Sequence, residues 1–150
     1  MGKIIKIFSD GASRGNPGLA GIGIAVMSDE GKLFETHKKF LGKYTNNYAE
    51  YVALIESVRL LRRMDREFDE INFYLDSELV VKQIKGEYKI KHKDLIKLSL
   101  EFWKEIKSLN KKFSINHIPR KENKLADQLA NEAIDENKFG AIEKSLLIKD

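Results

Sequence analysis

Apolar and polar residues alternate along the first third of the chain, in short runs separated by turn-forming residues. The runs cover residues 3–9, 22–27 and 32–41. Such runs predict β-strands, and three consecutive strands with tight connections are expected to pair antiparallel. The segment Gly11 to Gly18, between the first two runs, is rich in turn residues and predicts a loop.

Beyond residue 45, apolar residues recur mainly at helical spacing. The expected elements are helices over 46–64, 77–84, 93–109 and 123–136, and strands over 71–76 and 112–118. Because the two later strands are entered through helices, they should run parallel to the first strand. The order is therefore βββαβααβα, and the fold class is α/β: a mixed five-stranded sheet, three strands antiparallel and then two parallel, flanked by helices.

The length of the chain favours one domain. The 150 residues are expected to form a single domain over 1–150, with a core over about 3–137. No internal repeat and no linker-like composition divides the sequence. Residues 138–150 are expected to form a tail, in which Ser145–Ile148 adds an edge strand or docks on the core.

Charge gives the chain a basic character. Charged residues make up 33% of the sequence, and the formal net charge is +4 at pH 7. Ten lysines lie between Lys82 and Lys112, and such a stretch suits a polyanionic substrate. A solvated, lysine-rich helix is the alternative explanation of the same stretch.

The chain has no cysteine, which excludes disulfides, thiolate nucleophiles and cysteine-ligated zinc. It also has no long apolar run and no start that resembles a secretion signal. The expected protein is therefore cytoplasmic and without membrane contact, and we expect it to be a monomer.

Four acidic residues lie where strands are expected to end or helices to begin. Asp10 and Asp76 end two of the β-like runs, whereas Glu50 and Asp127 lie in the first turns of two predicted helices. Strand ends and helix starts gather at one rim of an α/β sheet, so the four carboxylates are expected to meet there. Such a cluster is costly unless cations neutralise it, and hard divalent ions are the natural cations. Taken singly, each acid also fits a turn, a cap or a helix start.

Four blocks of sequence carry a more specific signal. They are Asp10-Gly11-Ala12-Ser13-x-Gly15-Asn16-Pro17-Gly18, Thr45-Asn46-Asn47-x-Ala49-Glu50, Asp76-Ser77 and Asn123-x-x-Ala126-Asp127-x-Leu129-Ala130. Over roughly residues 3–137, these blocks resemble type 1 ribonuclease H, in the short form without the basic protrusion. The resemblance implies the ribonuclease H-like fold and an endoribonuclease that hydrolyses the RNA strand of RNA/DNA hybrids.

The resemblance also implies which residues carry the chemistry. Asp10, Glu50, Asp76 and Asp127 match the catalytic acids that bind two Mg²⁺ or Mn²⁺ ions in this family. Asp10 is expected to bridge both ions. Glu50 and Asp76 are expected to hold the ion on the leaving-group side, and Asp127 the ion on the nucleophile side. The products would carry 5′-phosphate and 3′-hydroxyl ends.

A second set of residues matches the family's substrate contacts. The set consists of Gly11, Ala12, Ser13, Asn16, Thr45, Asn46 and Asn47. Small residues after Asp10 let the backbone approach the RNA minor groove and its 2′-hydroxyls. Asparagine offers both a donor and an acceptor to base edges and sugars. Thr45, with neighbouring amides, is expected to hold a DNA phosphate.

Two features depart from the family pattern. The segment Gly86 to Lys93 is too short for the basic helix and loop of a longer bacterial form, and nearby lysines are candidates to replace them. His117 lies ten residues before Asp127, where the family often has a mobile histidine that assists product release. The alternation through Phe113, Ile115 and His117 instead predicts a strand. We retain His117 as an auxiliary candidate.

Two other functions fit parts of the pattern. A non-catalytic nucleic-acid-binding module would share the scaffold, but binding alone gives no reason to keep four acids beside phosphate. A related metal nuclease would act on DNA junctions or on double-stranded RNA. Asn46, Asn47 and the small residues of the loop favour the RNA/DNA hybrid as the partner, with double-stranded RNA as the second candidate.

Overall fold

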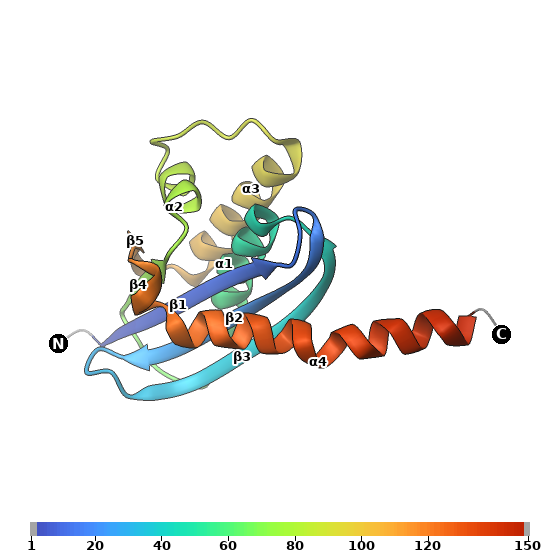
Figure 1. Ribbon diagram of the computed structural model, residues 1–150. Coiled ribbons are helices and arrows are strands. Elements are labelled where there is room, and N and C mark those ends of the chain that lie inside the picture. Colours follow the sequence, from blue (N-terminus) through green and yellow to red (C-terminus); the bar gives the residue numbers. More distant parts are fainter. Residues whose placement is uncertain (1–2, 149–150) are drawn as a thin grey trace.

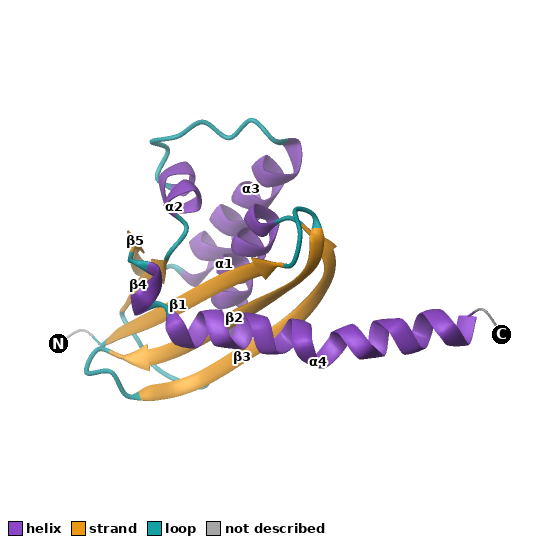
Figure 2. Ribbon diagram, in the orientation of Figure 1, coloured by secondary structure: helices purple, strands orange, loops and turns teal. Residues whose placement is uncertain are grey.

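The computed structural model describes residues 3–148, with side chains described for residues 3–137. The described residues form a β-sheet with helices on both faces (Figure 1, Figure 2). The elements are β1 (Ile4–Ser13), β2 (Gly18–Ser28), β3 (Leu33–Tyr44), α1 (Asn46–Arg63), β4 (Glu70–Leu75), α2 (Glu78–Ile84), α3 (Lys93–Leu109), β5 (Lys112–His117), the short 3-10 helix η1 (Arg120–Glu122) and α4 (Lys124–Ile148). The predicted order of strands and α-helices is confirmed, and η1 is an addition to it.

The sheet has the mixed topology that the sequence predicted. Its five strands lie in the order β3-β2-β1-β4-β5. β2 pairs antiparallel with both β1 and β3, whereas β1 pairs parallel with β4 and β4 with β5. The parallel pairs follow because β4 and β5 are each reached through helices, which return the chain to the same edge.

β2 is buried on both faces, which explains its long apolar run. On one face Ile22, Ile24 and Val26 join the main core with residues of α1. On the other face α4 packs so closely that a Cβ built on Gly23 would lie 2.1 Å from the carbonyl oxygen of Ala126. The absence of a side chain at this position therefore sets how near α4 lies to the sheet.

Several predicted strand boundaries are wrong. β1 extends through Ser13 instead of ending at Asp10, because Gly11, Ala12 and Ser13 continue the pairing with β2. Asp10 therefore lies inside a strand, opposite Gly23, and the expected loop shrinks to four residues, Arg14–Pro17.

The tail expected over residues 138–150 also differs from the prediction. α4 continues to Ile148, so Ser145–Ile148 form no edge strand, and residues 149 and 150 lie outside the described residues. Figure 1 shows the helix running past the edge of the sheet. The physical reason is local, since this stretch contains no proline to end the helix. In the described part of the chain, the helices all lack the length and apolar character that a membrane span requires.

Candidate active site

One cavity gathers the four acids that the sequence singled out. It measures about 530 Å³, and its wall comes from segments far apart in the chain. Asp10 comes from β1 and Glu50 from α1. Asp76 directly follows β4, and Asp127 lies near the start of α4. The other lining residues are Gly11, Ala12, Ser13, Arg14, Asn46, Asn47, Ser77, Arg120 and Asn131.

The start of α1 places Glu50. Thr45 is the N-cap, and its hydroxyl oxygen accepts a hydrogen bond from the backbone N–H of Tyr48 at 3.2 Å. The helix therefore begins at Asn46, and Glu50 is its fifth residue, one position beyond the first turn in which the sequence placed it. Asp127 does lie in the first turn of α4, as predicted.

Gly11 brings α1 against β1. A Cβ at this position would lie 2.3 Å from the carbonyl carbon of Ala49 and 2.4 Å from the nitrogen of Glu50. Contacts that short cannot form, so only glycine allows the two backbones to approach in this way. Gly11 thus has a packing role, beyond the contact with substrate that the resemblance implies: it brings the Glu50 backbone beside the strand that carries Asp10.

Three of the acids form a tight group. Asp10, Glu50 and Asp76 each offer one carboxylate oxygen, and these oxygens all lie within 4.8 Å of one another. Asp127 stands beside this group rather than in it, yet it is near enough to raise the pKa of Asp10. Its carboxylate lies 3.9 Å from the guanidinium of Arg120 and accepts a hydrogen bond from the Asn131 amide at 3.3 Å.

The tight group resists ionisation. Burial raises the pKa of Asp10 to about 7, and the charge of Asp76 acts in the same direction, whereas a hydrogen bond with Glu50 opposes it. Burial raises the pKa of Glu50 well above its ordinary value, and the charge of Asp10 adds to this effect. Burial also raises the pKa of Asp76, against a hydrogen bond from Asn123. Without a cation, the three carboxyls therefore tend to keep protons.

The residues present fit divalent metal ions. Glu50 Oε2 is buried and has no hydrogen-bond partner among the described residues. Buried carboxylate oxygens without a donor are rare, and a cation would satisfy this one. The convergent ligand atoms are all carboxylate oxygens, the donor type that Mg²⁺ and Mn²⁺ prefer. Asp10, Glu50 and Asp76 would hold such an ion, with Asp127 at its side.

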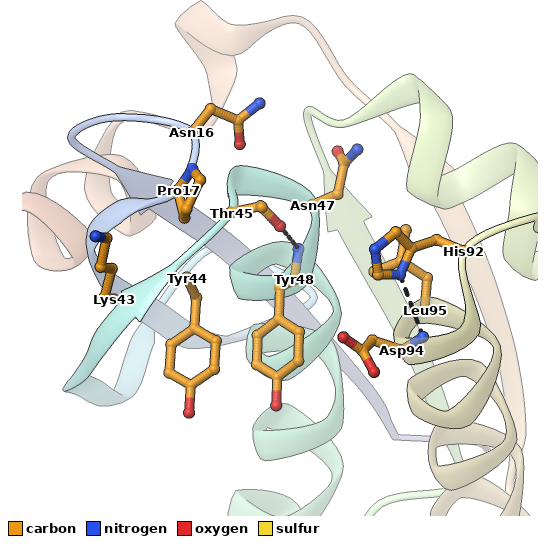
Figure 3. A pocket seen from close by; sticks show the side chains of 10 residues that line it. All are labelled: Asn16, Pro17, Lys43, Tyr44, Thr45, Asn47, Tyr48, His92, Asp94 and Leu95. Atoms are coloured by element: carbon orange, nitrogen blue, oxygen red, sulfur yellow. Dashed lines mark hydrogen bonds between the residues drawn. The ribbon is translucent and has the colours of Figure 1, made fainter.

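A second cavity, shown in Figure 3, shares Asn47 with the first. It measures about 430 Å³. Asn16, Lys43 and Thr45 form part of its wall, and the rings of Tyr44 and Tyr48 stack with centroids 4.3 Å apart. His92, the N-cap of α3, faces this cavity from the other side (Figure 3). The signal available in the sequence for His92 was its position just before the helix predicted over 93–109.

The fold and the acidic cavity agree with comparisons to known proteins. A family model described as reverse transcriptase-like matches residues 8–133. A curated ribonuclease HI of Halobacterium salinarum is 39% identical over 132 residues, which are 88% of this chain. The crystal structure of an RNase H1 from the same organism has a TM-score of 0.83 and 38% identity, and the match covers 89% of this chain and 98% of that one. The chain belongs to the ribonuclease H family.

A further ribonuclease H structure adds a ligand to the comparison. LC11-RNase H1, solved in complex with an RNA/DNA hybrid, has a TM-score of 0.81 and 36% identity, with 88% of this chain and 97% of that chain covered. Some curated relatives are longer: the chain spans 65% of the Halobacterium protein and 35% of several mycobacterial relatives.

The substrate residues implied by the ribonuclease H resemblance lie around the two cavities, and several of them brace one another. Asn46 accepts a hydrogen bond from the Ser13 N–H at 2.8 Å, and its own N–H donates to Asn16 at 3.3 Å. The Ser13 hydroxyl donates to the Tyr44 carbonyl at 2.7 Å. Part of the hydrogen-bonding capacity of Asn46 therefore holds the β1–β2 turn against the start of α1.

His117 ends β5, so the strand prediction for this residue is confirmed. Its side chain is exposed, and its charge lowers the pKa of Asp76 slightly against the larger effect of burial. The next residue continues the register, since the Ile118 N–H donates to the Leu75 carbonyl at 2.9 Å. His117 is thus placed by the sheet, and not by a loop of its own.

Sequence reasoning assigned no role to several polar residues around the acids of this ribonuclease H site. Arg120 in η1 lines the acidic cavity. Asn123 is buried, and its amide donates to the Ser9 carbonyl at 2.9 Å and to Asp76 at 3.4 Å. Arg14 and Asn131 also line the cavity. The signal available for Arg120 was its place between a predicted strand end and a predicted helix start, and Asn123 was already the first residue of the fourth sequence block.

Proposed function

We propose that this chain is an endoribonuclease that hydrolyses the RNA strand of RNA/DNA hybrids with the help of two divalent ions, Mg²⁺ or Mn²⁺. One observation carries the proposal: the carboxylates of buried Asp10 and Glu50 and of half-buried Asp76 converge in one cavity, and Glu50 Oε2 lacks any donor among the described residues. Such a group of carboxylates destabilises the fold by itself, and bound divalent cations would offset that cost and attract a phosphate. The LC11 relative in complex with a hybrid supports the same substrate.

The proposed role of each of the four acids follows from its position in the site. Asp10 interacts with each of the other three acids and would bridge the two ions, while Glu50 and Asp76 would complete the tight group on the leaving-group side. Asp127 stands apart from this group and would serve the nucleophile side. When bound, such ions supply Lewis acidity and a water of lowered pKa. The expected products have 5′-phosphate and 3′-hydroxyl ends.

The two adjoining cavities suit two strands of different chemistry. Gly11, Ala12, Ser13 and Asn46 line the acidic cavity, where the RNA strand and its 2′-hydroxyls would lie. Asn16 and Thr45 line the second cavity, where a DNA phosphate would lie. Asn47, which lines both, is placed to touch both strands of the hybrid.

The lysines of the Lys82–Lys112 stretch would add affinity that does not depend on sequence. Of these lysines, Lys82 and Lys112 form ion pairs among the described residues, with Glu78 and Glu70. Cations that remain available to phosphates make binding fall as salt concentration rises. Double-stranded RNA is the second substrate candidate. The single domain over 1–150, the monomeric state and the cytoplasmic location stay predictions.

A cleavage assay tests the proposal. Labelled RNA/DNA hybrid, RNA duplex and DNA duplex are each incubated with Mg²⁺, Mn²⁺ or chelator, and the product ends are mapped. We expect hybrid cleavage that requires metal and collapses in Asp10→Asn. Cleavage that persists in chelator would refute the metal mechanism, and tight hybrid binding without any cleavage would favour a binding module.

A further inference from the structure

Arg14 joins the β1–β2 turn to α4. One arm of its guanidinium, Nη1, lies 2.6 Å from Asp135 Oδ1. The other arm, Nη2, donates to Asn131 Oδ1 at 3.1 Å and lies 3.4 Å from the Asn131 carbonyl oxygen. Both partners belong to α4, and they lie 117 and 121 positions further along the chain.

Asn131 in turn forms hydrogen bonds with Asp127. Its amide nitrogen, Nδ2, donates to the Asp127 carbonyl oxygen at 3.0 Å and to the carboxylate oxygen Oδ1 at 3.3 Å. A continuous line of hydrogen bonds therefore runs from the turn after β1 to one of the four acids. The same turn carries Asn16, a predicted substrate contact that is tied to the start of α1.

The chemistry of the asparagine amide gives this line a direction. An amide has a donor end and an acceptor end, and only the donor end can face a carboxylate favourably. Arg14 offers N–H donors and no acceptor, so it satisfies the oxygen end of Asn131 and turns the NH₂ end toward Asp127. If the amide flipped, its NH₂ would face the guanidinium and its oxygen would face the carboxylate.

Asp127 is the acid that needs such support. It does not belong to the tight group of three carboxylates, and its side chain is 32% exposed. Its cationic neighbour Arg120 is 82% exposed and 3.9 Å away, too loose a contact to fix a rotamer. Ligands of a metal site are commonly oriented by hydrogen-bonded neighbours of this kind.

We propose that Arg14 is a positioning residue which, through Asn131, sets the orientation of Asp127 relative to the turn that receives the substrate. The inference rests on the proposed function, because it assigns Asp127 to an ion site. Its consequence is specific: loss of Arg14 weakens the ion site at Asp127 while the hybrid-binding surface stays in place.

The chain offers a matched control for this inference. Lys38 of β3 also ties α4 to the sheet, with Nζ 2.6 Å from Glu136 and 3.2 Å from Glu132. It contacts the same part of the same helix, but it does not line the acidic cavity. Both sets of ion pairs are partly exposed and contribute little to stability, so the fold should survive their loss.

The experiment compares Arg14→Ala, Asn131→Ala, their double variant and Lys38→Ala. Mn²⁺ binding is measured by calorimetry without substrate, and hybrid cleavage is measured over a range of Mg²⁺ concentrations. We expect Arg14→Ala and Asn131→Ala each to weaken Mn²⁺ binding and to raise the Mg²⁺ requirement by about tenfold, with KM for the hybrid little changed. The double variant should match the worse single variant, because both act along one line.

Two further variants sharpen the result. Arg14→Lys keeps the charge but not the planar fork, so it should restore only part of the Mn²⁺ affinity, and it replaces Arg14→Ala if that variant folds poorly. Lys38→Ala should bind Mn²⁺ as the unaltered protein does. Equal effects of Arg14→Ala and Lys38→Ala would overturn the inference, since helix anchoring would then explain both.

The remaining outcomes are also decisive. A raised KM with unchanged Mn²⁺ binding would make Arg14 a direct substrate contact and overturn the positioning role. Additive losses in the double variant would do the same. If the unaltered protein failed to cleave hybrid, the proposed function would be wrong. The calorimetry would still test the role of Arg14 independently, because unchanged Mn²⁺ binding in Arg14→Ala would by itself reject the inference.

Discussion

Asp10 destabilises the metal-free protein as pH rises, and replacing it with asparagine should reveal by how much. Burial raises the pKa of Asp10 from an ordinary value of 3.8 to about 7 in the folded protein. Between these two values the folded state holds a proton that the unfolded state has already released. Stability contributed by this group is therefore present at low pH and is lost as pH rises toward 7.

The magnitude follows from the size of the shift. Each pKa unit corresponds to about 1.4 kcal/mol, so ionising Asp10 in its folded surroundings costs up to about 4 kcal/mol at pH 8. Asp10 is 4% exposed, so solvent screens little of this cost. Glu50 and Asp76 both act on Asp10, so the three carboxyls titrate together. The free-energy cost of ionisation therefore belongs to the three acids as a group.

The measurement is chemical denaturation of the unaltered protein and Asp10→Asn at pH 5 and pH 8, with chelator present. Asparagine stays neutral at both pH values, so the variant should gain a few kcal/mol over the unaltered protein at pH 8 and less at pH 5. Asp29→Asn is the control, because Asp29 is 51% exposed and makes only a loose pair with Lys6 at 3.8 Å. It should change stability by less than about 0.5 kcal/mol.

The result that would refute this reasoning is equally clear. If Asp10→Asn gave the same gain at both pH values, the gain would not come from ionisation. If it gave no gain at pH 8, the burial of Asp10 would not carry the cost that the structure implies. Saturating Mg²⁺ should remove most of the advantage of the variant, because the ion compensates the negative charge in the unaltered protein.

Two other substitutions test the fold and the site separately. Gly23→Ala would place a methyl group 2.1 Å from the carbonyl oxygen of Ala126, so we expect α4 to shift. Stability should fall by about 1–3 kcal/mol or more, and hybrid cleavage should fall with it. If the variant unfolded thermally as the unaltered protein does, the helix would not be held this tightly. His117→Ala should keep most of its turnover, because the histidine ends a paired strand with its side chain exposed; a large loss of kcat would revive the role in product release that the resemblance implies.

Local pattern was enough to define most of the elements. The helix predicted over 93–109 has the bounds of α3, since its apolar spacing, its cap and the left-handed Asn110 after it are all local features. The four blocks of the ribonuclease H resemblance pointed to the four acids that line one cavity. These successes share a cause: each depends on residues within a few positions of one another.

Tertiary structure decided what depends on distant segments meeting. β1 runs through Gly11, Ala12 and Ser13 because β2 supplies partners for them, and turn composition alone predicted a loop. The contact of Arg14 with Asn131 spans 117 positions, and no sequence period reaches that far. The raised pKa of Asp10 likewise arises from burial beside Glu50 and Asp76, which are brought to it only when α1 and β4 pack against β1. Sequence determined which groups this site has, and packing determined their spacing and charge.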